Sequence, residues 1–136
     1  MTMSSATKKP TEAELSLLTI LWETGPATVR QVHQTYNENL PGEQHIGYTT
    51  VLKILQIMHE KKLVQRDERQ RAHIYAPSES AVQTQSSLIR DLVQKAFNGS
   101  LSQLVMRAIG NSTNAQEISD IRSMLDELEQ QQETVQ

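Results

Sequence analysis

Five short patterns, each typical of the first turn of an α-helix, divide this chain into segments. In each pattern a short polar side chain is followed three positions later by Glu or Gln, which is how an N-cap and its capping box are built. The pairs are Thr11 with Glu14, Thr28 with Gln31, Ser80 with Gln83, Ser100 with Gln103, and Asn114 with Glu117. So many helix starts within 136 residues predict a mainly α-helical protein with short helices.

A further helix is predicted from Thr49 to Lys62 by the spacing of its apolar residues. These residues recur at intervals of three and four, as expected for the buried face of a helix. They are Val51, Ile54, Leu55 and Met58. Burial of this stripe fixes the roll of the helix and turns another set of residues outward. The outward set is Thr49, Thr50, Lys53 and Gln56.

Two strand-like segments, residues 63–67 and 72–76, follow this helix around a charged turn. Their apolar residues predict a β-hairpin, although no Gly marks the turn at Glu68-Arg69-Gln70-Arg71. A strand-like link is also predicted at Pro26-Ala27. The order helix, link, helix, helix and hairpin is that of a winged helix-turn-helix domain. We therefore expect a mainly α fold with a small β-hairpin wing.

Three helices are predicted after Pro77, and each carries an apolar stripe. The residues concerned are Leu88, Leu92, Leu101, Leu104, Ile121, Leu125 and Leu128. Three short helices form too thin a bundle to bury these stripes, so a second copy of the chain is the expected cover. The expected organisation is a flexible N-terminus (1–9), a winged-helix DNA-binding domain (10–77) and a helical dimerisation domain (78–132).

The charge distribution is compatible with DNA binding despite a net charge of −3. Six of the thirteen Lys and Arg residues lie between Lys53 and Arg71, and only the face that meets phosphate must be positive. In a winged helix the third helix enters the major groove and the hairpin reaches nearby phosphates. The outward residues of the 49–62 helix would then read bases, while Arg69 and Arg71 would contact phosphate or a narrow minor groove.

Residue types required for several other functions are missing from the sequence. There is no Cys, no HExxH motif and no Gly-rich phosphate loop, and the four His residues do not lie at ligand spacing on one helix. We expect no catalytic residues, no metal site, no cofactor and no enzymatic activity. The sequence has no apolar run of about 20 residues, and residues 1–9 lack a signal-peptide core. A cytoplasmic protein without membrane insertion is expected.

Four segments carry a family resemblance. They are Val-Arg-Gln-Val-His at 29–33, Tyr-Thr-Thr-Val at 48–51, Lys-Lys-Leu-Val at 61–64, and Arg-Ala-His-Ile-Tyr-Ala-Pro at 71–77. Together with the acidic start and apolar continuation of residues 12–22, they resemble the BlaI/MecI family of penicillinase repressors. The resemblance covers about residues 10–128, and it is specific in the first 77 residues and only architectural beyond them.

The resemblance implies a homodimer that binds a palindromic operator in double-stranded DNA and is held together by its C-terminal helices. It also implies repression until a membrane metalloprotease sensor triggers cleavage of the repressor. The candidate DNA-binding residues are Arg30, Tyr48, Thr49, Thr50, Lys53, Gln56, Arg69, Arg71 and His73.

The sequence departs from the family pattern in two respects. Relatives inactivated by cleavage are cut at an Asn-Phe bond, and the bond at the corresponding place here is Arg107-Ala108. The copper-responsive relatives carry a C-terminal cysteine motif, so copper sensing by that route is excluded. The alternatives to a DNA-binding repressor are a winged-helix protein–protein interaction module and an effector-binding regulator without protease control.

Overall fold

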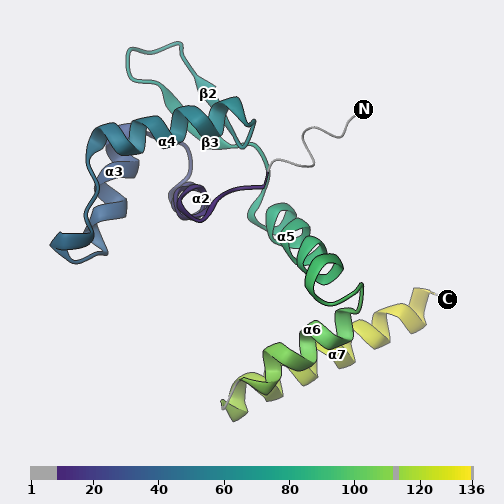
Figure 1. Ribbon diagram of the computed structural model, residues 1–136. Coiled ribbons are helices and arrows are strands. Elements are labelled where there is room, and N and C mark those ends of the chain that lie inside the picture. The colour runs from purple at the N-terminus through teal and green to yellow at the C-terminus, as the bar shows by residue number, and fades with distance from the viewer. Residues whose placement is uncertain (1–8, 112–113, 136) are drawn as a thin grey trace. The chain divides into compact units, whose positions relative to one another are not determined.

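The computed structural model describes residues 9–111 and 114–135 of the chain (Figure 1). Residues 1–8, which belong to the N-terminus expected to be flexible, lie outside the described residues. The chain forms two compact units, of which the first ends at Leu88 and the second begins at Ile89. The first unit thus includes the beginning of a helix after Pro77, and the division into functional domains at Pro77 stays a prediction.

The elements of the first unit follow the order expected for a winged helix-turn-helix domain. They are α2 (Glu12–Thr24), β1 (Ala27–Thr28), α3 (Val29–Glu38), the 3₁₀ turn η1 (Gly42–Gln44), α4 (Tyr48–Glu60), β2 (Val64–Asp67) and β3 (Ile74–Pro77). Three further helices follow, namely α5 (Ala81–Ala96), α6 (Leu101–Gly110) and α7 (Ala115–Val135). The predicted fold class, mainly α with a small wing, is confirmed.

Side chains at the predicted positions cap most of the helices. Thr11 Oγ1 accepts the Glu14 N–H at 3.2 Å, and Glu14 Oε1 accepts the Thr11 N–H at 2.9 Å. Reciprocal pairs of the same kind start α3 and α5, and Ser100 and Asn114 cap α6 and α7. In the part of the chain described, α4 is the only α-helix without a side-chain N-cap, because Gly47 holds that position.

A small antiparallel sheet with the strand order β1-β3-β2 closes the first unit. Tyr75 in the central strand pairs with Ala27 on one side and with Arg66 on the other. The second strand of the hairpin begins at Ile74, so the prediction that Ala72 and His73 are strand residues was wrong. The reason is that the β2–β3 ladder ends at the pair Asp67–Ile74, and β1 on the other side also pairs no further than Ile74. Residues 68–73 therefore form a wider loop than expected.

The core of the first unit is formed by all three of its complete helices and by the sheet. Its buried members are Leu17, Leu18, Leu21, Ala27, Val29, Val32, Val51, Leu55, Met58, Val64 and Tyr75. The predicted apolar stripe of α4 belongs to this core, with Ile54 half-buried at its edge. The roll of α4 about its axis is therefore the one that the sequence predicts.

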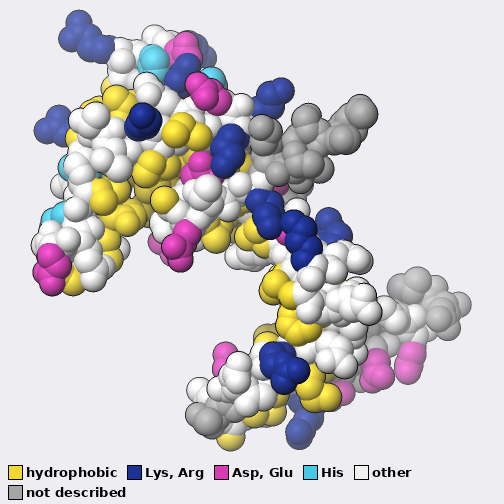
Figure 2. Space-filling model, viewed as in Figure 1, with side chains coloured by type: hydrophobic (Ala, Val, Ile, Leu, Met, Phe, Trp, Pro, Cys, Tyr) yellow, Lys and Arg dark blue, Asp and Glu magenta, His cyan; other side chains and the backbone are white. Residues whose placement is uncertain are grey.

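The second unit buries far less apolar surface. Among its described side chains Val93 alone is buried. Large apolar residues remain exposed on all three helices, as the yellow side chains in Figure 2 illustrate, and they are Ile89, Leu92, Leu101, Met106, Met124, Leu125 and Leu128. The expectation of uniformly short helices was wrong for α7, which has 21 residues. No Gly or Pro follows Asn114 to end this helix earlier.

Candidate nucleic-acid interface

The outward face of α4 presents the four residues that the sequence assigns to base reading. Thr49, Thr50, Lys53 and Gln56 are all exposed, whereas Val51 and Leu55 on the opposite face are completely buried. Within the described residues none of these four side chains has a hydrogen-bond or ion-pair partner. Their hydroxyl, ammonium and amide groups are therefore available to an external ligand, which is what base recognition requires.

The first turn of α4 differs from the starts of the other α-helices. Gly47 supplies no side-chain acceptor, so the backbone N–H groups of the first turn are not satisfied by a cap. Tyr48, the first residue of the helix, is also about half exposed. An uncapped helix start can direct its N–H groups at an anion such as a phosphate.

A hollow of about 540 Å³ lies between the start of α3, the start of α4 and the wing loop, residues 68–73. It is lined by Thr28, Val29, Arg30, His33, Tyr48, Ala72 and His73. Three of the predicted DNA-binding residues, Arg30, Tyr48 and His73, are thus brought to one place from three parts of the chain. Sequence reasoning named these residues but could not place them together.

Two ion pairs join the end of β2 to the wing loop, and they involve Arg66 of β2 and Arg69 of the loop. Arg69 Nε donates to Asp67 Oδ1 at 3.0 Å, and Arg69 Nη2 donates to Asp67 Oδ2 at 2.8 Å. Arg66 Nη2 lies 2.6 Å from Glu68 Oε2. The side chain and the backbone N–H of Arg69 lower the pKa of Asp67 to about 2, and Arg66 lowers the pKa of Glu68. Two acidic residues that sequence reasoning did not weigh therefore neutralise part of the wing.

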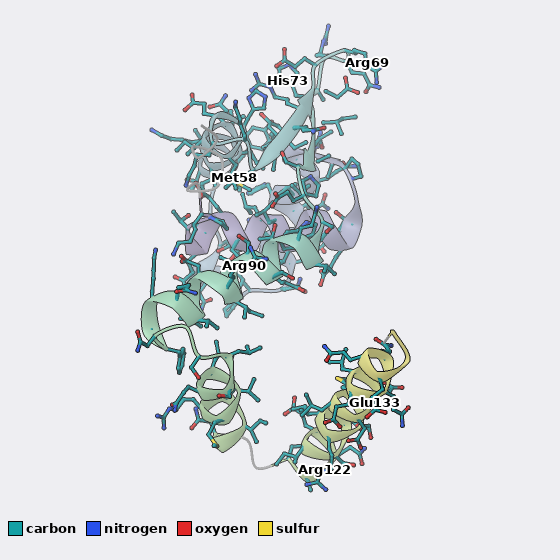
Figure 3. All side chains as sticks on the ribbon, turned by 90° about the vertical axis from the view of Figure 1, so that its right-hand side faces the viewer. Met58, Arg69, His73, Arg90, Arg122 and Glu133 are labelled. Carbon is teal, nitrogen blue, oxygen red and sulfur yellow. The ribbon has the colours of Figure 1, made fainter. Side chains whose placement is uncertain are left out.

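The remaining predicted wing residues lie on the same loop. Figure 3 shows Arg69 and His73 where the hairpin turns, and Figure 2 shows acidic, basic and histidine side chains next to one another in the upper part of the view. Arg71 is exposed and forms no ion pair with a described residue. It is therefore the wing arginine most accessible to a phosphate.

The loop before α4 is tied to α3 by contacts that sequence reasoning missed. Asn37 binds both backbone groups of Ile46, and His33 Nε2 lies 2.9 Å from Ile46 O. The His33 ring also meets the Tyr48 ring edge-on, with centroids 6.0 Å apart. The available signal was the four-residue spacing of His33 and Asn37, which places both on one face of α3.

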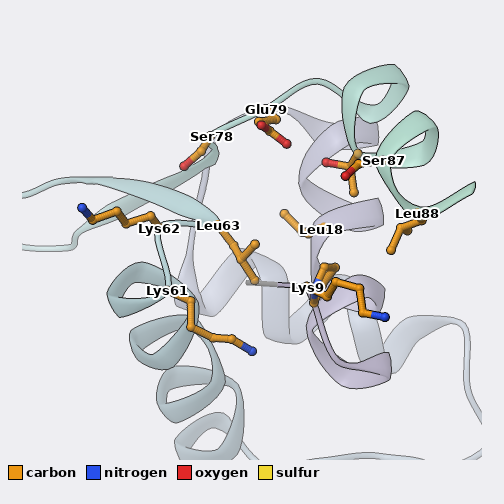
Figure 4. A pocket seen from close by; sticks show the side chains of 11 residues that line it. Lys9, Leu18, Lys61, Lys62, Leu63, Ser78, Glu79, Ser87 and Leu88 are labelled. Atoms are coloured by element: carbon orange, nitrogen blue, oxygen red, sulfur yellow. The ribbon is translucent and has the colours of Figure 1, made fainter. Parts of the chain in front are cut away.

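Lys61, at the end of α4, serves a structural purpose. Its Nζ lies 2.7 Å from Oε1 of Glu14, the same carboxylate atom that accepts the Thr11 N–H. Glu14 is 4% exposed, and Lys61 lines a hollow of about 510 Å³ with Leu18, Leu63 and Leu88. Figure 4 shows Lys62 directed away from Leu18 and Leu88 in this hollow. Lys61 therefore joins α4 to α2.

Comparison with known proteins agrees with this geometry. A model of the penicillinase repressor family matches residues 10–127. The transcriptional regulator BlaI of Mycobacterium tuberculosis, in strains CDC 1551 and H37Rv, is 33% identical to the chain over 119 residues, which are 87% of this chain and 83% of that protein. The chain belongs to the penicillinase repressor family. It is therefore a transcriptional repressor rather than an enzyme, as the sequence predicts.

The predicted dimerisation residues of this repressor are placed on α5, α6 and α7. Leu92, Leu101, Leu125 and Leu128 are exposed, each at roughly half of its surface, whereas Leu88, Leu104 and Ile121 are intermediate. The bond between Arg107 and Ala108 lies inside α6, and both residues are exposed.

The described part of the repressor contains neither a candidate metal-binding group nor a candidate membrane-spanning helix. Among its described residues no group of three or more His, Asp and Glu side chains is arranged to hold a metal ion. None of the helices in the described ranges combines the length and apolar character needed to cross a membrane.

Proposed function

We propose that this repressor binds an operator in double-stranded DNA as a homodimer, with α4 in the major groove of each half-site. The observation that carries the proposal is the outward face of α4. Buried Val51, Leu55 and Met58 on the opposite side fix its roll, and its polar residues have no partner among the described residues. Such an operator lies on the genome, so this function places the repressor in the cytoplasm.

In this proposal, the side chains of α4 contact the bases. Thr49, Thr50 and Lys53 lie in the N-terminal turns, where recognition helices make most of their base contacts. Gln56 lies one turn beyond Lys53, and its amide can form two hydrogen bonds with an adenine edge.

Residues around α4 contact the DNA backbone. Arg30, Tyr48 and His73 share the hollow beside the first turn of α4. Arg69 and Arg71 on the wing loop reach phosphates further along the duplex. These contacts position the protein without carrying sequence information.

In this proposal, the second unit forms the dimer interface. Its exposed leucines include Leu92, Leu101, Leu125 and Leu128, and a monomer would leave them in water. A second copy can cover them, and a two-fold dimer requires two half-sites related by the same symmetry. The operator is accordingly expected to be palindromic.

In this proposal, a protease in a metalloprotease sensor pathway inactivates the repressor by cleaving the bond between Arg107 and Ala108. Cleavage there would detach the end of α6 and all of α7 from the first unit. Repression would then be lost because the dimer weakens, while the DNA-binding surface stays intact. Since the bond lies within α6, a protease requires local unwinding of that helix before it can cut.

The salt dependence of DNA binding tests this function. Affinity for duplexes enriched from a random-sequence pool should fall steeply between 50 and 200 mM salt, because binding releases about 0.9 counterion per phosphate contact. Arg30→Ala should reduce the slope of log affinity against log salt by about 1, whereas Gln34→Ala, on the same helix, should leave it unchanged. A chain that enriches no duplex and binds DNA without salt dependence would instead be a protein-interaction module.

A further inference from the structure

The start of α4 needs support from outside the helix. Gly47 provides no side-chain cap, and the loop that leads into it contains only the short turn η1. Burial of Val51, Leu55 and Met58 fixes the helix from Val51 onward. Thr49 and Thr50 precede Val51, so the core does not determine the position of their turn by itself.

Asn37 supplies this support through both ends of its side-chain amide. Its Oδ1 accepts the Ile46 N–H at 3.1 Å, and its Nδ2 donates to Ile46 O at 3.0 Å. Two hydrogen bonds from one rigid amide to one residue restrict both the distance and the rotation of that residue. Ile46 directly precedes the N-cap of α4. Fixing Ile46 therefore also restricts the position of the first turn of the helix.

His33 reinforces the same point of the loop. Its Nε2 lies 2.9 Å from Ile46 O and donates to that oxygen when it carries hydrogen. The ring also meets the Tyr48 ring edge-on, at an interplanar angle of 82°. One side chain of α3 thus contacts residues on both sides of Gly47.

We infer that Asn37 and His33, the loop clamp, are positioning residues that hold the first turn of α4 in the orientation needed for base recognition. The inference rests on the proposed function, since it concerns the same DNA-binding surface. The loop clamp touches no base itself. It acts on specificity because a base contact tolerates only about 0.5 Å of misplacement, whereas a phosphate contact with a long cationic side chain adapts more readily.

The test compares two DNA duplexes on the full-length protein. One is the sequence that the wild type enriches most from a random pool, and the other has the same base composition in shuffled order. Asn37→Ala should lower the affinity for the enriched duplex roughly tenfold, as expected for loss of a well-formed base contact. Its affinity for the shuffled duplex should change less than about twofold, because phosphate contacts are retained. Gln34→Ala, exposed on α3 and outside the loop clamp, should leave both affinities unchanged.

His33 variants separate positioning from general destabilisation. His33→Ala should lower the same specificity ratio, and His33→Gln should restore most of it, because a Gln amide nitrogen can reach the place of Nε2. Equal losses on both duplexes for Asn37→Ala and His33→Ala would assign the loop clamp to folding alone and overturn the inference. An unchanged ratio in both variants would overturn it as well. Failure of the wild type to enrich any duplex would contradict the proposed function itself, which distinguishes the two.

Discussion

The two compact units of this repressor differ in how completely they bury their apolar side chains. Eleven buried apolar residues form one core in the first unit, whereas Val93 alone is buried among the described residues of the second. The first unit can therefore account for its own stability, while the second exposes leucines on three helices. The difference indicates that folding of the DNA-binding surface and assembly of the dimer depend on separate sets of residues.

The largest effect is expected from removal of the second unit. A fragment ending at Leu88 should remain folded but become monomeric, because the exposed leucines of α5, α6 and α7 are lost. Its affinity for the enriched duplex should fall by about 100-fold or more, since two linked half-site contacts become one. Light scattering and fluorescence anisotropy measure the two effects. A fragment that stays dimeric would place the interface in the first unit.

Matched leucine substitutions sharpen the comparison. Leu55→Ala in the core of the first unit should lower the free energy of unfolding by about 2–5 kcal/mol. Leu128→Ala in the second unit should leave unfolding of the first unit nearly unchanged and weaken self-association instead. Thermal unfolding and sedimentation at several concentrations measure these effects. If Leu128→Ala lowered the stability of the first unit as much as Leu55→Ala, the two units would not be separate.

The ion pair between Glu14 and Lys61 gives a smaller effect of the same kind. Glu14→Ala removes both a helix cap and the partner of Lys61, so it should cost about 1–2 kcal/mol of stability. This range is moderate because Lys61 keeps access to water, with 23% of its side chain exposed. Glu127→Ala on exposed α7 is the control and should change stability by less than about 0.5 kcal/mol. Chemical denaturation compares the two, and equal effects would contradict the structural assignment of Glu14.

The smallest effect is expected from Asp67, the last residue of β2, which pairs with Arg69 of the wing loop. Asp67→Asn removes the partner of Arg69, so affinity for enriched and shuffled duplexes should rise by a similar factor of roughly two to five. Anisotropy measures both affinities, and an unchanged or lower affinity would show that Asp67 does not compete with phosphate.

The wing ion pair also has a predicted pH dependence. Because the pKa of Asp67 is depressed, its contribution is fully present above the ordinary value of 3.8 and is lost only as pH falls through about 2. An NMR titration of the Asp67 carboxylate should therefore give a midpoint near 2. A midpoint near 4 would mean that Arg69 is not held in solution.

The sequence predicts the features of this fold that depend on local chemistry. Thr11, Thr28 and Ser80 start their helices as expected because an N-cap needs only residues within one turn. The roll of α4 follows from the spacing of four apolar residues, and it directs the expected polar residues outward. The resemblance of the first 77 residues gives the family.

The features that the sequence does not predict depend on contacts between distant positions. Glu14 and Lys61 are 47 residues apart, so no local pattern signals their ion pair. Ala72 and His73 have strand-like neighbours, yet the β2–β3 ladder ends at Asp67 and Ile74 and leaves them in the wing loop. The contacts of Asn37 with Ile46 depend on how the loop before α4 folds back, which the composition of the loop does not specify.

Binding selection on randomised half-sites tests the central claim that α4 of a dimer reads the operator. The wild type should enrich two half-sites related by a two-fold axis and spaced by about one helical turn of DNA. Lys53→Ala and Gln56→Ala should each relax the preference at one or two positions per half-site, by about 1–3 kcal/mol, and leave the other positions and thermal stability intact. Identical preferences for the wild type and both variants would contradict the claim and place the reading surface elsewhere.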